Sequence, residues 1–424
     1  MRADDAAHPP SCPPLATQVA ARAGVYWHAA QWSPPRLAEL ARHLAERGGA
    51  ALRELADGEL LAAWGDTVSR FRDPESPERQ ALDPALARLS GLSPAGLSAA
   101  LEAVLGGVAA GPSEELRTAA GGARARGLVV VMLAGNVPAL AVQPLLPALL
   151  LRLPVLLKSA SSEPLFAPAF LGALGSRLPA LTEGAAAITW RGGQEELEAP
   201  LLARASRVLA YGGRETMASL ARRAPGKVVD YGPKLSLAVV ASDADAAAVA
   251  AGLARDVALF DQRGCLSVQA VYVQHDAVPF AAALAAALAE VAAELPPGPA
   301  DPVAAAHVHQ LRAEAEMRGL WLSALPLTLG TVVVEPLPPL RPSPGLRTVR
   351  VHPLADLDAL AGLLFPWQGR LQGAALAGER AWQLRDALAN LGISRCAPPG
   401  ELQAADALWH NGGRSPVEVL AGTA

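Results

Sequence analysis

Residues 128–158 read LVVVMLAGNVPALAVQPLLPALLLRLPVLLK, and they contain the first strand–helix–strand unit that the sequence predicts. The run LVVVML at 128–133 is short, apolar and typical of a strand that is buried on both faces. A turn, AGNVP, and an apolar helix follow it, and PVLLK at 154–158 predicts the next strand. The uncharged stretch 128–151 is also long enough to span a bilayer. The polar Asn136 and three prolines disfavour that alternative, because polar groups inside a membrane are costly.

Strands and helices continue to alternate after this unit, which predicts parallel βαβ units with right-handed crossovers. Further strands are expected at 185–190, 207–211, 227–230, 236–240, 268–274, 332–334 and 346–351. Before the unit, apolar residues recur at three- and four-residue steps from Pro35 to Leu116, which predicts helices. We therefore expect an α/β protein with this division: a flexible tail at 1–20, a helical N-terminal region at 21–118, α/β domains at 119–240 and 241–395, and a C-terminal segment at 396–424.

Composition excludes several classes of protein. Among 424 residues, 51% are hydrophobic and 18% are charged, which excludes an intrinsically disordered chain. The net charge of −4 leaves no basic excess for nucleic-acid binding. Cys12, Cys265 and Cys396 are widely spaced, so neither a disulfide framework nor a CxxC metal site is expected. The N-terminal segment MRADDAAHPPSCPP lacks the apolar core of a signal peptide. We expect a cytoplasmic protein with no metal, no membrane span and no nucleic-acid partner.

Cys265 is the candidate nucleophile. It lies in LFDQRGCLSVQ, on an expected loop between a helix and a strand, after a glycine and among polar residues. A thiol acts as a nucleophile in its thiolate form, which needs a lowered pKa and access to substrate. The alternative is a small buried hydrophobic side chain, as most free cysteines are. Cys396 and Cys12 lack the polar loop setting.

Four other candidate residues lie at the end of an expected strand or just after one. Asn136 comes after the first strand, where its amide could either serve a turn or donate to a developing oxyanion. Lys158 ends the second strand, and its ammonium could either reach solvent or bind a dinucleotide. Gly212 and Gly213 open a helix, where backbone N–H groups can approach a pyrophosphate. The chain has no GxGxxG fingerprint.

These segments together resemble the aldehyde dehydrogenase superfamily, and more closely the LuxC-type long-chain acyl-CoA reductases. The resemblance rests on VMLAGNVP, LLKSASSEP, YGGRET, YGPKLS and DQRGCLS in this order, and it covers about residues 35–420. It implies an aldehyde dehydrogenase-like fold in which two Rossmann-like parallel-sheet domains follow the helical region. The domain at 119–240 would then bind the dinucleotide, and the domain at 241–395 would carry the nucleophile.

The resemblance also implies an NADPH-dependent reductase that makes an aldehyde from a long-chain acyl-CoA. Cys265 would attack the thioester and become an acyl-enzyme, while Asn136 and the backbone N–H of Cys265 hold the oxyanion. Lys158 would contact the adenosine ribose, and Gly212 and Gly213 would line the cofactor channel.

Two positions refine this expectation. NAD-preferring relatives often carry a glutamate where this chain has Ser161, and a serine does not repel the 2′-phosphate of NADPH. Asp230 stands where oxidising relatives carry a general-base glutamate, but it is one methylene shorter. It could equally be an ordinary acid at the end of a strand.

Two other functions stay open at this point. One is an oxidising aldehyde dehydrogenase, for which a base must reach a water molecule. The other is an acyl-transfer or scaffold protein that has kept only the fold. As partners we expect an acyl-CoA or another activated acyl donor, a second copy of the chain in a homo-oligomer, and an enzyme that supplies acyl groups.

Overall fold

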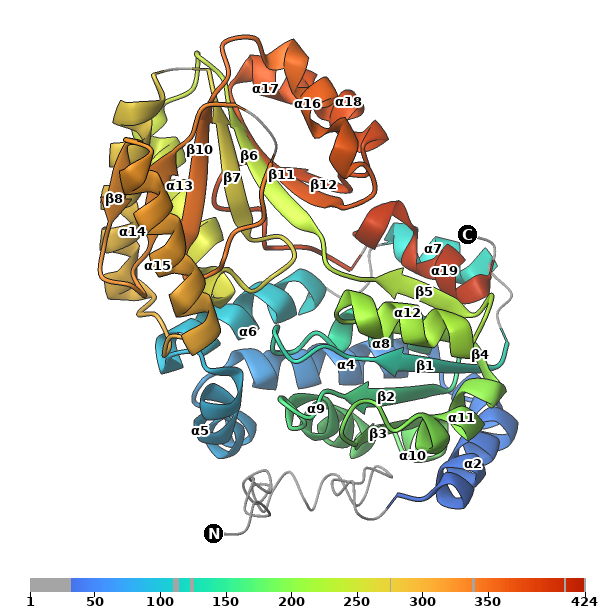
Figure 1. Cartoon of the computed structure of the whole chain (residues 1–424). Helices are drawn as coiled ribbons and strands as arrows, with labels where there is room; N and C mark the ends of the chain where they lie inside the picture. Colours follow the sequence, from blue (N-terminus) through green and yellow to red (C-terminus); the bar gives the residue numbers. More distant parts are fainter. Residues whose placement is uncertain are drawn as a thin grey trace.

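A computed structural model describes residues 32–109, 114–122, 126–274, 276–337, 340–407 and 409–422. Two β-sheets form its framework, with the strand orders β3-β2-β1-β4-β5 and β12-β11-β6-β7-β10-β9-β8 (Figure 1). All neighbouring strands in these sheets are parallel except β8 and β9. This architecture confirms the predicted α/β class. The expected tail at 1–20 lies outside the described residues.

The smaller sheet contains the unit predicted from residues 128–158. Its strands are β1 (Leu128–Met132), β2 (Val155–Ser159), β3 (Ala185–Thr189), β4 (Ala205–Tyr211) and β5 (Val228–Tyr231). The helices that connect them are α8 (Val142–Leu150), α9 (Phe166–Gly175), α10 (Leu181–Gly184), α11 (Glu195–Arg204) and α12 (Arg214–Arg223). The stretch 128–151 is therefore a core strand, a turn and a core helix.

Both faces of this sheet are covered, which explains why β1 is apolar throughout. Val129 and Val131 pack on one side in a core shared with α4, α6, α8 and α9. Leu128 and Val130 pack on the other side with residues of α2, α11 and α12. Fully burying one such side chain contributes about 1.5–3 kcal/mol. Successive side chains of a strand point to opposite faces, so neither face of β1 leaves room for a polar residue.

The larger sheet begins with β6, one residue before the strand expected at 236–240. Its strands are β6 (Leu235–Val240), β7 (Val268–Val273), β8 (Leu322–Ala324), β9 (Thr331–Val334), β10 (Thr348–Pro353), β11 (Leu371–Ala377) and β12 (Arg395–Ala397). Because β6 pairs with β7 and β11, the chain passes between the sheets at residues 232–234. The expected boundary at 240 falls at the end of β6.

Helices cover this sheet on both faces as well. They are α13 (Ala246–Ala258), α14 (Ala277–Glu294), α15 (Pro302–Met317), α16 (Leu360–Leu364), α17 (Glu379–Gln383) and α18 (Arg385–Asn390). Short 3-10 turns occur at Leu259–Gln262 (η3), Leu357–Ala359 (η4), Phe365–Trp367 (η5) and Asn411–Gly413 (η6). Within the described ranges, α14 alone is long and apolar enough to cross a membrane, and its apolar face packs in the core with α13 and β9.

The N-terminal region is helical, as predicted. It comprises α2 (Pro34–His43), a π-helical turn η2 (Leu44–Gly48), α3 (Gly49–Arg53), α4 (Asp57–Arg72), α5 (Pro77–Ser90), α6 (Pro94–Ala109) and α7 (Glu114–Gly122). At the other end of the chain, α19 (Pro416–Ala421) returns to the smaller sheet and packs against α8 (Figure 1). The Arg207 side chain on β4 donates from Nε to the Val419 carbonyl, 3.3 Å away.

Candidate active site

A cleft of about 1060 Å³ lies where the two sheets meet. Its walls include the segments that follow β1, β2 and β4, at residues 133–137, 160–162 and 212–213, together with the loop at 262–266 that precedes β7. Ligands of open α/β sheets bind at the carboxyl ends of parallel strands, because loops from several strands converge there. Cys265, Asn136, Lys158, Ser161, Gly212 and Gly213 all line this cleft.

Cys265 is exposed on the cleft wall. Its carbonyl accepts a hydrogen bond of 2.8 Å from the Ser236 hydroxyl on β6. Desolvation by the surrounding protein raises the pKa of the thiol to about 11, against the opposing effects of the Cys265 and Leu266 N–H groups and of Lys234. These N–H groups and Lys234 are the features that favour its thiolate.

Asn136 reaches across the cleft to the nucleophile loop. Its Nδ2 atom donates to the carbonyl oxygen of Arg263 at 2.7 Å, two residues before Cys265. An amide nitrogen carries two hydrogens, so this bond leaves the second one available to another acceptor. The bond thus fixes the distance between the amide and the Cys265 loop, and the free hydrogen can serve an oxyanion formed at the thiol.

Lys158 lies at the far side of the cleft in a largely buried setting. Its Nζ atom is 5.6 Å from the centroid of the Trp190 ring. Burial lowers the pKa of the ammonium, and the nearby Glu198 carboxylate opposes this shift. Glu198 is itself bonded to the Trp190 Nε1 atom at 3.0 Å and to Arg223 Nη2 at 2.7 Å. These side chains hold the lysine stem against Trp190.

The remaining predicted cofactor residues form the wall near Lys158. Ser161 is exposed in the cleft. Gly213 is the N-cap of α12 and offers no side-chain oxygen, so the first N–H groups of that helix have no side-chain cap. A Cβ atom added at Gly213 would meet no other atom within 4 Å, which leaves this backbone open to a ligand. Such a turn suits a pyrophosphate group.

Asp230 is the predicted residue that does not itself line the cleft, although its carboxylate is close enough to the cleft residue Lys234 to raise the pKa of that ammonium. It is exposed at the end of β5, and it is not among the residues that line the cleft. Its Oδ1 atom accepts a hydrogen bond of 2.6 Å from the Gly232 N–H, which closes the turn between the two sheets. The geometry gives this carboxylate a structural task in that turn.

Several cleft residues were not predicted from the sequence. Lys234 lines the cleft close enough to Cys265 for each group to shift the pKa of the other. The chain has only three lysines, and the position of this one in YGPKLS was the available signal. Arg223 gave no signal, because arginine is the usual basic residue of this chain. Gln403, Trp409 and Asn411 come from the C-terminal segment, whose path across the cleft no local pattern predicts.

The chemistry available at the site is covalent and free of metal ligands in the described parts of the chain. There, no group of three or more His, Cys, Asp and Glu side chains could hold a metal ion. Cys265, Asn136 and Lys234 line the same cleft as Lys158, Ser161 and the Gly212–Gly213 turn. These residue types are compatible with a nucleophile and a phosphate-bearing cofactor in one cleft.

Comparisons with known proteins agree with this architecture. Among solved structures, the glyceraldehyde-3-phosphate dehydrogenase GapN from Methanocaldococcus jannaschii, complexed with NADP, superposes with a TM-score of 0.68 at 12% identity, covering 92% of each chain. Lactaldehyde dehydrogenase from Escherichia coli superposes with a TM-score of 0.65 at 17% identity, covering 85% of this chain and 83% of that one. These similarities show that the chain has the aldehyde dehydrogenase fold.

Sequence comparison identifies the family. A long-chain acyl-protein thioester reductase of Aliivibrio fischeri is 28% identical over 286 residues, which are 66% of this chain and 59% of the relative. A second such reductase, from Photobacterium leiognathi, is 28% identical over 160 residues, or 36% of this chain and 33% of that one. The matched part thus spans less than two thirds of either relative. The family model of the LuxC acyl-CoA reductases matches residues 91–421, and the chain therefore belongs to the LuxC family.

Proposed function

We propose that this protein is a fatty acyl reductase that converts a long-chain acyl thioester, in the first instance an acyl-CoA, to the aldehyde with NADPH. One observation carries the proposal. The Asn136 amide is bonded to the Arg263 carbonyl beside the exposed Cys265 thiol, within a cleft that also contains Lys158 and the Gly212–Gly213 turn. Membership of the LuxC family supports the same reaction.

The first step of the proposed reaction is acyl transfer to the protein. The Cys265 sulfur attacks the thioester carbonyl as a thiolate, and the new C–S bond forms as the bond to the leaving thiol breaks. The Cys265 thiol loses its proton to solvent before the attack, and the departing thiolate takes up a proton from solvent, so the charge balances. Asn136 and the Cys265 N–H donate to the carbonyl oxygen while it carries negative charge. Lys234 supports the thiolate electrostatically, since its ammonium lowers the pKa of Cys265.

The second step is reduction of the acyl-cysteine. A bound NADPH supplies the hydride for this step. The resulting thiohemiacetal oxygen faces the same two donors, and its collapse releases the aldehyde and returns the thiolate of Cys265. Lys158 and Ser161 would hold the adenosine end of the cofactor, and the open N-terminus of α12 after Gly213 would hold its pyrophosphate.

The position of Asp230 favours reduction over oxidation. An oxidising enzyme must hydrolyse its acyl-cysteine, which requires a base that reaches a water molecule near the thioester. The Asp230 carboxylate instead binds the Gly232 N–H and is not among the groups that line the cleft. An acyl-cysteine formed at Cys265 would therefore persist until hydride arrives.

A second acyl donor is a specific alternative to acyl-CoA. The curated relatives are named acyl-protein thioester reductases, so a protein-bound acyl group is the natural competitor as substrate. The cleft opens to solvent at Cys265 and can accept an acyl chain from either carrier.

The test is a steady-state assay with acyl-CoAs of increasing chain length and with NADPH or NADH. The proposal predicts one aldehyde formed for each NADPH oxidised, with long chains preferred. Cys265→Ser should abolish the reaction, whereas Cys396→Ser should not affect it. If an acyl-protein supports NADPH oxidation and none of the acyl-CoAs does, the acyl-protein is the donor. Absence of aldehyde with every donor would refute the proposed function.

A further inference from the structure

Three consecutive residues before the nucleophile have a left-handed backbone. Phe260, Asp261 and Gln262 have φ angles of 58°, 49° and 61°, and none is a glycine. A left-handed conformation costs an L-residue roughly 1–2 kcal/mol, so single residues adopt it and runs are rare. Such a run persists only when surrounding contacts hold it, and backbone strain of this kind gathers at functional sites.

Asp261 makes the contacts that hold the middle of this run. Its Oδ1 atom accepts from Arg347 Nη2 at 2.7 Å and from Arg347 Nε at 3.2 Å. Its Oδ2 atom accepts from the Gly298 N–H at 2.9 Å. Arg347 is 1% exposed, and its own φ of 56° is left-handed. The ion pair therefore joins two strained segments of the chain.

The neighbours of Asp261 anchor the run on its other sides. Phe260 is buried in the core that the N-terminal helices share with the smaller sheet. Gln262 donates from Nε2 to the carbonyls of Val268 and Thr348 at 2.9 and 2.7 Å, and its Oε1 atom accepts from the Thr348 N–H at 2.9 Å. Phe260 thus packs in a core, while Asp261 and Gln262 both bind the segment at Arg347 and Thr348.

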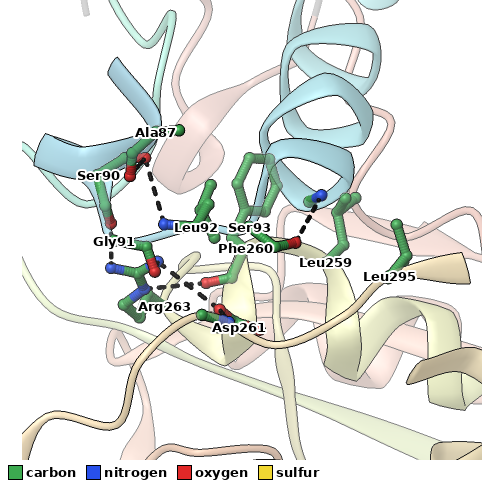
Figure 2. Close-up of polar contacts among 12 residues, drawn as sticks. Ala87, Ser90, Gly91, Leu92, Ser93, Leu259, Phe260, Asp261, Arg263 and Leu295 are labelled. Atoms are coloured by element: carbon green, nitrogen blue, oxygen red, sulfur yellow. Dashed lines mark hydrogen bonds and ion pairs between the residues drawn. The ribbon is translucent and has the colours of Figure 1, made fainter. Parts of the chain in front are cut away.

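Arg263 connects residues 260–262 to the reacting groups. Figure 2 shows its guanidinium beside the junction of α5 and α6, where Nη1 donates to the Ser90 carbonyl at 2.5 Å. Its own carbonyl accepts the Asn136 amide at 2.7 Å. Cys265 follows two residues later. The conformation of residues 260–262 therefore determines the position of the Cys265 thiol and of the Arg263 carbonyl to which Asn136 is bound.

We propose that Asp261 is a positioning residue of the acyl-transfer reaction, which acts by holding residues 260–262 left-handed through its ion pair with Arg347. The proposal rests on the proposed function, because it assumes that Cys265 is acylated. By holding this backbone conformation, the Asp261 side chain keeps the Cys265 thiol at a fixed position relative to the Asn136 amide.

Three substitutions separate this role from a general contribution to stability. Asp261→Ala removes the carboxylate and keeps the cost of a left-handed backbone. Asp261→Gly also removes the carboxylate but removes that cost. Asp261→Asn keeps one oxygen acceptor for Arg347, and asparagine tolerates the left-handed region. Asp358→Ala is the control for the loss of an ion pair outside the nucleophile loop, because Asp358 on η4 forms an exposed ion pair with Arg380 at 3.0 Å.

The experiment measures the rate of CoA release in the first turnover, with saturating long-chain acyl-CoA and without NADPH. Asp261→Ala should slow this step by about 10²-fold, the usual effect of misplacing a reacting group by about 1 Å. Asp261→Gly should be roughly 5–30-fold faster than Asp261→Ala. Asp261→Asn should lie between Asp261→Gly and wild type. The KM for NADPH and the rate of Asp358→Ala should equal the wild-type values.

Two results would overturn the proposal. Equal rates for Asp261→Ala and Asp261→Gly would show that the backbone conformation is not the means. Wild-type rates in all three Asp261 variants, with a lower melting temperature, would show a structural role alone. If Asp261→Ala does not fold, the first-turnover rates of Asp261→Asn, Asp261→Gly and wild type are compared instead. Wild-type rates in both variants would refute the proposal. A wild-type protein that releases no CoA contradicts the proposed function itself, which keeps the two failures distinct.

Discussion

Replacing Asn136 by alanine removes the side-chain amide that is bonded to the Arg263 carbonyl, two residues before the nucleophile. The Nδ2 atom lies 2.7 Å from the Arg263 carbonyl, and its second hydrogen is free for the substrate oxygen. Loss of one oxyanion donor typically slows an acyl-transfer step by roughly 10²–10³-fold. The hydrogen bond to Arg263 adds about 1 kcal/mol to stability, because water in the cleft can replace it.

These two magnitudes predict a characteristic result. Asn136→Ala should release CoA roughly 10²–10³-fold more slowly in the first turnover. Its melting temperature should fall by no more than about 4 °C. Asn136→Asp should be at least as slow, since a carboxylate cannot donate to either acceptor and repels an oxyanion. The exposed Asn390 at the end of α18 provides a control, and Asn390→Ala should match wild type.

Stopped-flow detection of free CoA, together with thermal unfolding, measures both quantities. A first-turnover rate within threefold of wild type would refute the oxyanion role of Asn136. A loss of rate accompanied by a melting temperature more than 10 °C lower, as a rough threshold, would trace the effect to the fold instead.

Three further predictions concern charge. Lys234 lowers the pKa of Cys265, so Lys234→Met should raise that pKa. Alkylation of Cys265 by iodoacetamide at pH 8 should then slow by about tenfold, as measured by peptide mass spectrometry with Cys396 of the same molecule as the reference. An unchanged rate would show that Lys234 does not influence the thiolate. Ser161→Glu should lower kcat/KM for NADPH relative to NADH by at least about tenfold through repulsion of the 2′-phosphate, and an unchanged ratio would exclude this contact. Burial raises the pKa of the Glu163 carboxyl from 4.5 to about 7. The protonated carboxyl therefore contributes fully to the stability of the folded state below pH 4.5. This contribution is lost as the pH rises through 7, and the total loss in the free energy of unfolding is about 3 kcal/mol. Glu163→Gln should thus become more stable than wild type between pH 5 and pH 8 in chemical unfolding, and parallel pH profiles of the two proteins would contradict this.

The smaller sheet could be predicted from the sequence because its strands are short apolar runs separated by helices of regular period. In β1, both faces of the strand are buried, so burial alone determines the residue types. The two strands β5 and β6 were predicted separately, but their assignment to different sheets was not, because only three residues separate them.

The site was predictable where a residue follows a strand, and less so elsewhere. Asn136 follows β1 and Lys158 lies near the carboxyl end of β2, and a parallel sheet brings such positions to one edge. Asp230 also ends a strand, but β5 is the edge of its sheet and the side chain turns to the Gly232 N–H. The ion pair of Asp261 and Arg347 joins residues 86 apart in sequence, which no local pattern reveals.

The central claim is that Cys265 carries the acyl group between the two half-reactions. Acylation needs no nicotinamide, so the wild-type protein mixed with a long-chain acyl-CoA and no NADPH should gain one acyl group per chain and release one CoA. Intact-protein and peptide mass spectrometry should locate that group on Cys265, and subsequent addition of NADPH should remove it as aldehyde. Cys265→Ser should gain no acyl group, whereas Cys396→Ser and Cys12→Ser should behave as wild type. An adduct on another residue, or one that persists in Cys265→Ser, would contradict the account.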